Sequence, residues 1–274
     1  MDREYRWGFN LMELYERDLY LNPYIEYLFN KKIIEYDISD AGINLSYYYK
    51  LLPVSKLDEI KALPKKEHAI KLGLIQRESE VYKNELSKAF VNMRRKLFKE
   101  NDIQEDDVLS IKKDAVFMLK SLDVTQFDNV IFKDKHTYTS YIRLNGKYEL
   151  YYNGDTIDVK GINESNVEKH EDGFLKIMKR FFYIGETQRP EDLLSYLVSI
   201  YDQYKWRKLD IEYYREFNPR SLFHIQNGWE TDYEIAGNIR YYDDPISLDI
   251  RRVDIDYNRQ ILLKLIAFVS EKML

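Results

Sequence analysis

Apolar residues recur at three- and four-residue intervals through the first thirty positions, a spacing typical of amphipathic helices. Such a spacing is followed by Leu11, Leu14, Tyr15 and Leu19 until Asn22-Pro23 interrupts it. The pattern predicts an N-terminal helix up to the interruption and a short second helix over 24–30.

The period then changes from helix to strand and back. Residues 32–38 are rich in β-branched and aromatic side chains and predict a strand. A small polar turn at 39–42 precedes an apolar helix predicted over 43–52 and closed by Pro53. Helical spacing dominates residues 55–100, which predict an inserted helical region.

After residue 100 the alternation is that of strands. Residues 107–119 predict either two strands joined by a tight turn near Lys112-Lys113 or one strand with a bulge there. Asn-Gly pairs at 145–146 and 153–154 are strong hairpin signals. Further strands are predicted at 129–132, 137–144, 148–152 and 156–160.

Helical spacing returns after Val167. The predicted helices cover 171–184, 190–206 and about 256–273, while 218–250 has no predicted element. The whole pattern predicts an α+β chain with an antiparallel sheet. A weak boundary near Ser165 divides it into 1–165, with the helical insertion at about 55–100, and a mostly helical 166–274.

Composition narrows the chemistry. With 45% hydrophobic and 32% charged residues in 274, the chain is that of an ordinary globular protein. Zero cysteines exclude disulfides and thiolate zinc sites, and the four histidines are far apart in sequence. No membrane span or signal peptide is recognisable, so we expect a cytoplasmic protein of a bacterium or of a phage-infected cell. Catalysis, if present, falls to carboxylates.

Charge is unevenly distributed. The formal net charge is −5, yet residues 56–100 carry twelve Lys and Arg against seven Asp and Glu. Local charge is what a phosphate backbone experiences. The charge of the helical insertion therefore fits a contact with phosphate, although a solvated helix face is the commoner outcome for such a run of charges.

Two aspartates accompany predicted buried strands. Asp37 follows Ile33–Tyr36, and Asp114 precedes Ala115-Val116-Phe117. Carboxylates on neighbouring strands can share Mg²⁺ together with substrate phosphates. The alternative is structural: Asp37 caps the following helix, and Asp114 sits in a turn bonded to backbone or to Lys113.

Five short segments, in this order, resemble motifs of B-family DNA polymerases. Glu35–Ile43 is similar to the first palm motif, an aspartate followed by x-x-S-L-Y-P, and Lys88–Asn92 to the K-x-x-x-N of the fingers helix. Lys112–Phe117 resembles the D-T-D-S palm motif, Lys135–Tyr138 the K-K-x-Y motif, and Asp158–Ile162 the lysine–glycine segment that ends the palm. The resemblance implies a palm-like sheet, inserted helical fingers and a C-terminal thumb.

The resemblance also assigns roles. Asp37 and Asp114 would be the catalytic metal ligands for Mg²⁺, with Mn²⁺ as an alternative. Ser39, Asp40 and Lys88 would meet the nucleoside triphosphate, and Lys71 or Arg94 could substitute for Lys88. The residues implied to hold primed DNA or RNA are Arg94, Lys135, Tyr138 and Lys160.

The chain departs from the family at several positions. Lys112 stands at the first aspartate of D-T-D, and Gly42 or Ile43 falls at the tyrosine of S-L-Y-P. Only about 32 residues precede the first motif, too few for an exonuclease domain. Three interpretations fit: a minimal polymerase, the C-terminal piece of a split polymerase with a partner chain, and a descendant that has lost catalysis. The second hypothesis is a catalytically silent interaction or nucleic-acid-binding protein, on a palm-like or unrelated α+β fold, encoded by a phage.

Overall fold

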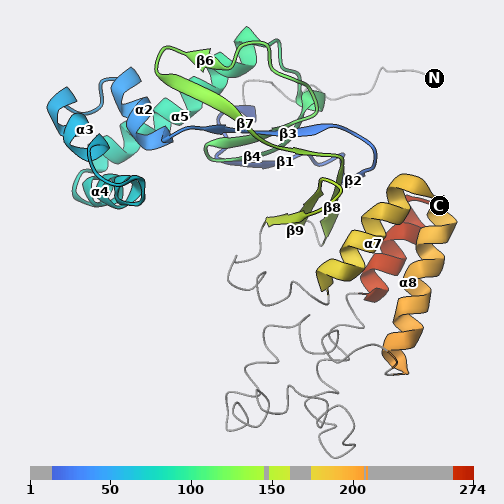
Figure 1. Cartoon of the computed structure of the whole chain (residues 1–274). Coiled ribbons are helices and arrows are strands. Elements are labelled where there is room, and N and C mark those ends of the chain that lie inside the picture. Colours follow the sequence, from blue (N-terminus) through green and yellow to red (C-terminus); the bar gives the residue numbers. More distant parts are fainter. Residues whose placement is uncertain (1–13, 145–147, 161–173, 207, 209–261) are drawn as a thin grey trace, which may run out of the picture. The chain divides into compact units, whose positions relative to one another are not determined.

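The structure, a computed structural model, describes residues 14–144, 148–160, 174–206, 208 and 262–274. Its elements form two compact units, which we describe separately (Figure 1). Unit 1 comprises residues 1–25 and Lys31–Tyr138, and unit 2 comprises Glu26–Asn30 and Thr139–Leu274. Both contain antiparallel sheet and helix, so the predicted α+β class is confirmed.

Unit 1 is built on a six-stranded sheet in which every recorded pair is antiparallel. Across the sheet, the strands are β1 (Leu19–Leu21), β4 (Val108–Lys112), β5 (Ala115–Met118), β3 (Ile33–Ile38), β7 (Val130–Tyr138) and β6 (Gln126–Phe127). The predicted strand at 32–38 is thus confirmed as the central β3, and 107–119 form two strands with a tight turn.

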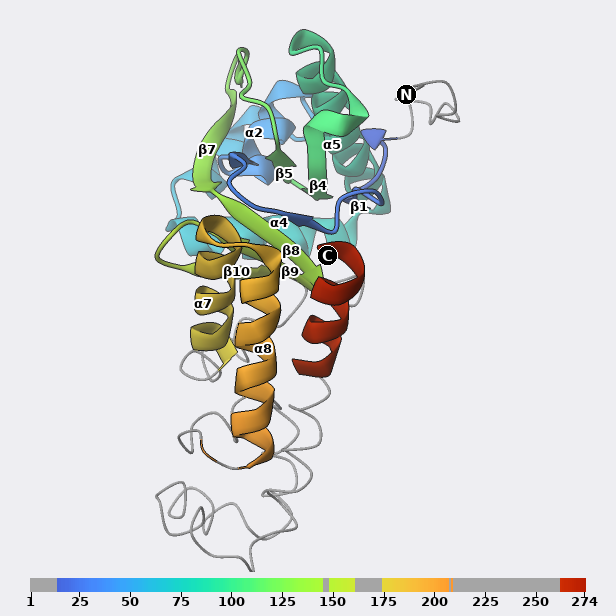
Figure 2. The same ribbon diagram turned by 90° about the vertical axis from the view of Figure 1, so that its right-hand side faces the viewer.

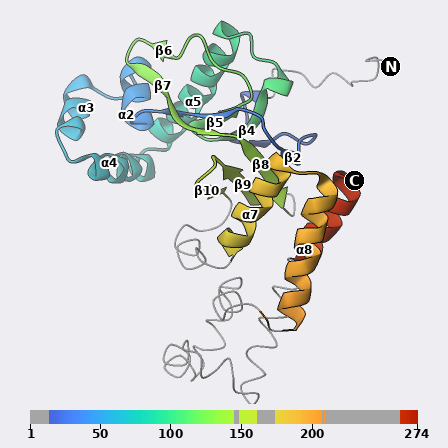
Figure 3. The ribbon, with the colours of Figure 1, turned by 45° about the vertical axis from the view of Figure 1, so that its right-hand side comes forward.

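Helical residues pack on one face of this sheet. The helices between β3 and β4 are α2 (Ala41–Tyr48), α3 (Val54–Lys61), α4 (Lys65–Glu78) and α5 (Glu80–Glu100), followed by the short η1 (Glu105–Asp107). Leu86, Met93 and Leu97 of α5 pack with Ile34 and Tyr36 of β3 in one buried cluster. Figure 3 shows α3 and α4 extending past the end of the sheet as a helical lobe of unit 1.

The side chains of β3 that alternate with Ile34 and Tyr36 point away from the helices, to the second face of the sheet. Since successive residues of a strand point to opposite faces, Glu35 and Asp37 leave the helix-packed core and lie on the second face of the sheet. This alternation creates the polar surface described below.

The helix predicted for the N-terminal residues is wrong where the structure describes it. Leu19–Leu21 form β1, which pairs with β4, and Tyr27–Leu28 form β2, which pairs with β8 in unit 2. Pairing with distant strands overrides the local helical spacing, as short segments commonly allow. Residues 1–13 lie outside the described residues.

Unit 2 contains a four-stranded antiparallel sheet in the order β10-β9-β8-β2. After β2, its strands are β8 (Ser140–Leu144), β9 (Tyr148–Tyr152) and β10 (Ile157–Lys160). The turn between β9 and β10 contains Gly154 at φ 100°, a conformation that glycine adopts without strain and that fits the predicted Asn153-Gly154 hairpin.

In the described part of unit 2, the helices are α7 (Phe174–Thr187), α8 (Pro190–Lys205) and a C-terminal helix over 262–272 (Figure 2). They match the three helices predicted for this region wherever the structure describes it. Phe181 and Phe182 of α7 share a buried cluster with Ile142, Leu150 and Leu265. The predicted turn at 145–146 and the segments 161–173 and 218–250 lie outside the described residues.

Apart from the segment 26–30, the units divide at Tyr138/Thr139. The reason lies in the strands: β8, β9 and β10 form their sheet with β2 and pack on the helices that follow, so they belong to unit 2. The boundary predicted near Ser165 lies outside the described residues. Among the described helices none is long and apolar enough to cross a membrane.

Candidate functional site

The two predicted aspartates meet at one end of the central strands of unit 1. Asp37 is the fifth residue of β3, and Asp114 lies in the turn between β4 and β5. β3 pairs with β5 so that Asp37 is registered with Ala115, next to Asp114. The Ile38 N–H donates to the Asp114 carbonyl oxygen at 3.4 Å. The structure therefore brings together residues that are 77 positions apart in the sequence.

The turn that carries Asp114 is held from below by Arg94. Lys112 pairs with Ala115, and Lys113 adopts a left-handed conformation at φ 54° to close the turn. Arg94 Nη1 donates to the Lys113 carbonyl at 2.6 Å, and Nη2 donates to Asp18 Oδ1 at 3.1 Å. Arg94 Nε donates to the carbonyl oxygen of Tyr15.

These bonds change the role of Arg94. Its side chain is 1% exposed, and burial lowers the pKa of its guanidinium, with Asp18 opposing that effect. A buried guanidinium bonded to two backbone carbonyls does not reach a phosphate backbone. The structure thus replaces the expected nucleic-acid contact by a structural role in placing the Asp114 turn.

Lys135 reaches the carboxylates because β7 contains a bulge. The register between β3 and β7 shifts between Glu35 and Tyr36, and Lys135 is the extra residue of β7. Its Nζ lies 3.2 Å from Asp37 Oδ2 and 3.6 Å from Glu35 Oε1. Bulges of this kind re-aim a side chain beside a site. Lys135, expected to contact nucleic acid, therefore lies among the carboxylates in this structure.

Glu35 is the member of the site that sequence reasoning missed. It is 2% exposed, and Tyr138 donates its hydroxyl to Glu35 Oε2 at 2.8 Å. A signal for it was available: Glu35 and Asp37 are two residues apart in a predicted strand, and such residues share a face.

Tyr138 has a different place from the expected one. It is 1% exposed, and its ring stacks on Phe117 with a centroid distance of 6.4 Å and an interplanar angle of 24°. The buried ring offers no surface for nucleic acid, so its structural role is to hold Glu35.

The electrostatics of the site favour an added cation. Burial, followed by the negative charge of Asp37, raises the pKa of the Asp114 carboxyl, and Lys135 opposes the shift. Burial lowers the pKa of Lys135, but its hydrogen bond to Asp37 and the charges of Glu35 and Asp37 outweigh that effect, so the net pKa shift is upward. Asp37 and Asp114 therefore repel each other, and their oxygens are the ligand type that Mg²⁺ prefers. For a cation to bind Asp37, the Lys135 ammonium would have to move away from that carboxylate.

The expected triphosphate contacts are arranged less simply. The Ser39 N–H donates to the carbonyl oxygen of Ile131 at 3.1 Å, so that backbone donor is already used. The Asp40 carboxylate lies 3.9 Å from both Lys65 Nζ and His68 Nδ1, which links the start of α2 to α4.

The two remaining predicted lysines lie outside this cluster. Lys88 is exposed on α5, with its Nζ 2.7 Å from Glu85 Oε1. Lys160 belongs to β10 of unit 2, where its Nζ lies 4.0 Å from Asp158 Oδ2. The roles of both lysines stay predictions.

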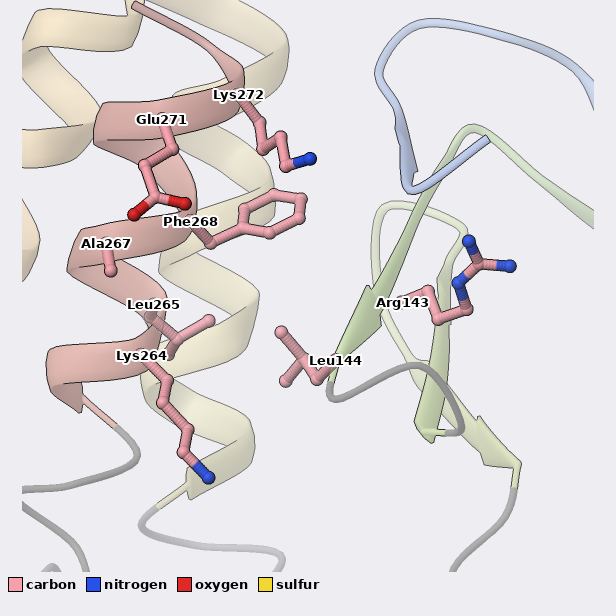
Figure 4. A pocket seen from close by; sticks show the side chains of 8 residues that line it. All are labelled: Arg143, Leu144, Lys264, Leu265, Ala267, Phe268, Glu271 and Lys272. Atoms are coloured by element: carbon pink, nitrogen blue, oxygen red, sulfur yellow. The ribbon is translucent and has the colours of Figure 1, made fainter. Parts of the chain in front are cut away.

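Unit 2 has a hollow of its own, between β8 and the C-terminal helix (Figure 4). It measures about 250 Å³, and Leu144, Leu265 and Phe268 give it an apolar wall. Arg143, Lys264 and Lys272 lie at its rim. None of the predicted site residues lines it.

The family model that matches the chain is described as the bacteriophage PBS1 gene 130 protein, and it covers residues 11–270. The chain belongs to this family. The family supports the expected phage association. No curated protein matches the chain.

Proposed function

We propose that unit 1 is a polymerase-like palm that adds nucleotides to the 3′ end of a primer, with Asp37 and Asp114 as its catalytic carboxylates. One observation carries the proposal: two carboxylates, one on β3 and one in the adjacent β4–β5 turn, lie close enough for the charge of Asp37 to raise the pKa of Asp114. A structure that keeps two repelling carboxylates together has a reason to do so when they bind a cation.

The order of elements also supports the proposal. β3 runs directly into α2, and the helices α3, α4 and α5 separate it from the β4–β5 hairpin. This order is similar to a palm with inserted fingers, as the motif resemblance implies. The helices of unit 2 would then be the thumb-like region.

Each residue of the site has a task in this proposal. Asp37 and Asp114 would hold Mg²⁺, or Mn²⁺, which supplies Lewis-acid polarisation of the phosphoryl oxygens when bound. Arg94 fixes the turn and so the direction of Asp114. The exposed Lys88 would approach the triphosphate as a point charge, as lysines commonly do.

A second candidate function rests on Lys135. Its ammonium already neutralises Asp37, and Lys112 replaces a carboxylate of the resembled motif. Both features suit a palm-like scaffold that binds a partner and does no chemistry. Fold alone does not decide between the two.

The decisive experiment is primer extension by the purified chain with Mg²⁺ and nucleoside triphosphates. Asp37→Asn and Asp114→Asn should each reduce extension by at least about a hundredfold, the scale on which loss of one charge-stabilising group is felt. Asp123→Asn, an exposed aspartate of unit 1, is the matched control and should extend normally.

The outcomes separate the candidates. Wild-type extension that survives Asp37→Asn or Asp114→Asn would refute the assignment of that carboxylate. The silent scaffold would be favoured if the wild-type chain extends no primer, either alone or after addition of an extract of phage-infected host cells. Extension only after such addition would support a split polymerase with a partner chain.

Binding of primed nucleic acid gives a separate test. With Arg94 and Tyr138 buried and the Lys135 ammonium paired with Asp37, Lys88 and Lys160 remain as the proposed contacts. Each Lys→Met substitution should reduce the slope of log K against log salt by about 1. An unchanged slope in both variants would remove these residues from the interface.

A further inference from the structure

The Lys135 ammonium lies against the Asp37 carboxylate, where it would compete with a bound cation for the same negative charge. Its nitrogen lies 3.2 Å from Asp37 Oδ2 and 3.6 Å from Glu35 Oε1. The two carboxylates differ in access, since Asp37 is 27% exposed and Glu35 only 2% exposed. Lys135 thus bridges one carboxylate that solvent reaches and one that it does not.

Glu35 is fixed independently of Asp37. The Tyr138 hydroxyl donates to Glu35 Oε2 at 2.8 Å, which leaves Oε1 directed at Lys135. Tyr138 is itself held by burial and by its stacking on Phe117. Glu35 therefore keeps its place whichever partner Asp37 has.

Lys135 is the movable member of this group. Its side chain is 48% exposed and starts from the bulge of β7, and a lysine ammonium on a four-carbon stem shifts between partners by rotation. A small movement away from Asp37 leaves it paired with Glu35, which it already approaches.

We propose that Glu35 is a positioning residue that receives the Lys135 ammonium when a divalent cation takes Asp37, so that Lys135 is the internal counter-ion of the cation-free site. The inference rests on the proposed function for the role of Asp37 as a metal ligand. Without cation, Lys135 limits the repulsion between Asp37 and its acidic neighbours. With cation, Glu35 neutralises the displaced ammonium, which then remains beside the site.

The test measures Mn²⁺ binding to the full chain by electron paramagnetic resonance of the free ion, and requires no activity. Lys135→Met should bind Mn²⁺ at least about tenfold more tightly, because a competing charge a few ångströms away is removed. Glu35→Gln should bind it several-fold more weakly, because Lys135 then has only Asp37 as a partner.

The double variant identifies what Glu35 does. If Glu35 acts through Lys135, Lys135→Met combined with Glu35→Gln should bind Mn²⁺ as tightly as Lys135→Met alone. Weaker binding by the double variant would overturn the proposal and make Glu35 a metal ligand. Tyr138→Phe, which keeps the ring and removes the hydroxyl, should weaken Mn²⁺ binding in the same direction as Glu35→Gln but less.

Controls guard against trivial effects. Lys83→Met removes an exposed lysine from an ion pair with Glu80 on α5 and should leave Mn²⁺ affinity unchanged. Thermal unfolding of each variant checks that it is folded, and Asp37→Asn should abolish the Mn²⁺ site in every background.

Failure of this inference and failure of the proposed function look different. A wild-type chain that extends primers but has the same Mn²⁺ affinity as Lys135→Met refutes the counter-ion and leaves the proposed function intact. A chain that shows the expected Mn²⁺ pattern without primer extension refutes the polymerase proposal and leaves the counter-ion in place. Absence of Mn²⁺ binding in both wild type and Lys135→Met overturns both.

Discussion

One face of each sheet shows a different kind of interaction. In unit 2, the face of the four-stranded sheet that packs on α7 and α8 is covered by close apolar contacts: Tyr152 stacks on Phe182 with a centroid distance of 5.0 Å and an interplanar angle of 6°. In unit 1, the second face of the six-stranded sheet carries Glu35 and Asp37, with Lys135 as their counter-charge. The face in unit 2 is stabilised by apolar packing, whereas the face in unit 1 carries ion pairs between acidic and basic side chains.

The difference indicates where each unit accepts an energetic cost. Apolar surfaces in close contact are stable without any ligand. A cluster of carboxylates with one shared ammonium is less stable than its apolar equivalent, and such clusters are typically retained for function. The comparison therefore predicts that substitutions will weaken unit 2 through sterics and change unit 1 through charge.

The largest expected effect on stability is that of replacing Arg94, whose buried guanidinium holds the turn that carries Asp114. Arg94→Met removes three hydrogen bonds and leaves the carbonyls of Tyr15 and Lys113 without that partner, at a cost of about 3 kcal/mol or more. Urea unfolding measures it. Arg95→Met removes only an exposed contact to Glu16 and should cost less than about 1 kcal/mol, so equal effects would contradict the structural role of Arg94.

The next effect tests packing in unit 2. A methyl group at Gly185 of α7 would overlap the ring of Phe29, so Gly185→Ala should destabilise by about 1–3 kcal/mol despite the better helix propensity of alanine. Thermal unfolding measures the change. Phe29→Leu in the same background should recover part of the loss, and no recovery would mean that the ring is not the obstacle.

A smaller effect tests charge in unit 1. Asp114→Asn removes the repulsion with Asp37 and should stabilise the cation-free protein at neutral pH by less than about 1 kcal/mol, because the carboxylates are only partly buried.

The pH dependence of stability shows whether the charge of Asp114 stabilises or destabilises the folded protein. Since the folded pKa of Asp114 is raised, the folded state binds more protons just above the ordinary value of 3.8, and stability falls as pH rises through that window. The advantage of Asp114→Asn should therefore appear above pH 3.8 and level off at higher pH. A destabilised Asp114→Asn across the whole pH range would argue against repulsion.

The smallest expected effect is at Gly73 in α4, where an added methyl group meets nothing within 4 Å. Gly73→Ala should stabilise by about 0.5–1 kcal/mol through helix propensity alone. It is measured beside Gly185→Ala, and the opposite signs of two identical substitutions would sharpen the contrast between open and filled surfaces.

The sequence predicted elements best where local signals and tertiary pairing agree. The strand at 32–38 and the turn beside Lys113 are examples, because β-branched residues and short turns report their own conformation. Leu19–Leu21 were missed because their strand exists only through pairing with β4. Period alone does not reveal a partner 90 residues away.

The candidate site was predicted in part for similar reasons. Asp37 and Asp114 were found from their places beside apolar strands. The burial of Arg94 and Tyr138 was not predicted, because residue type tells only that a side chain is polar, not which face it reaches. The approach of Lys135 to Asp37 and Glu35 depends on a bulge in β7, and residue spacing in the sequence does not predict such a bulge.

The exchange of segments between the units has a consequence for how the chain is made and dissected. β2 is synthesised early and pairs with β8, which follows more than a hundred residues later, so the sheet of unit 2 is incomplete until β8 has left the ribosome. A fragment starting at Thr139 would lack β2 and expose the edge of β8, and an exposed strand edge promotes aggregation. Supplying residues 26–30 as a linked segment should restore its solubility. The natural cut between the units is therefore not a single point on the chain.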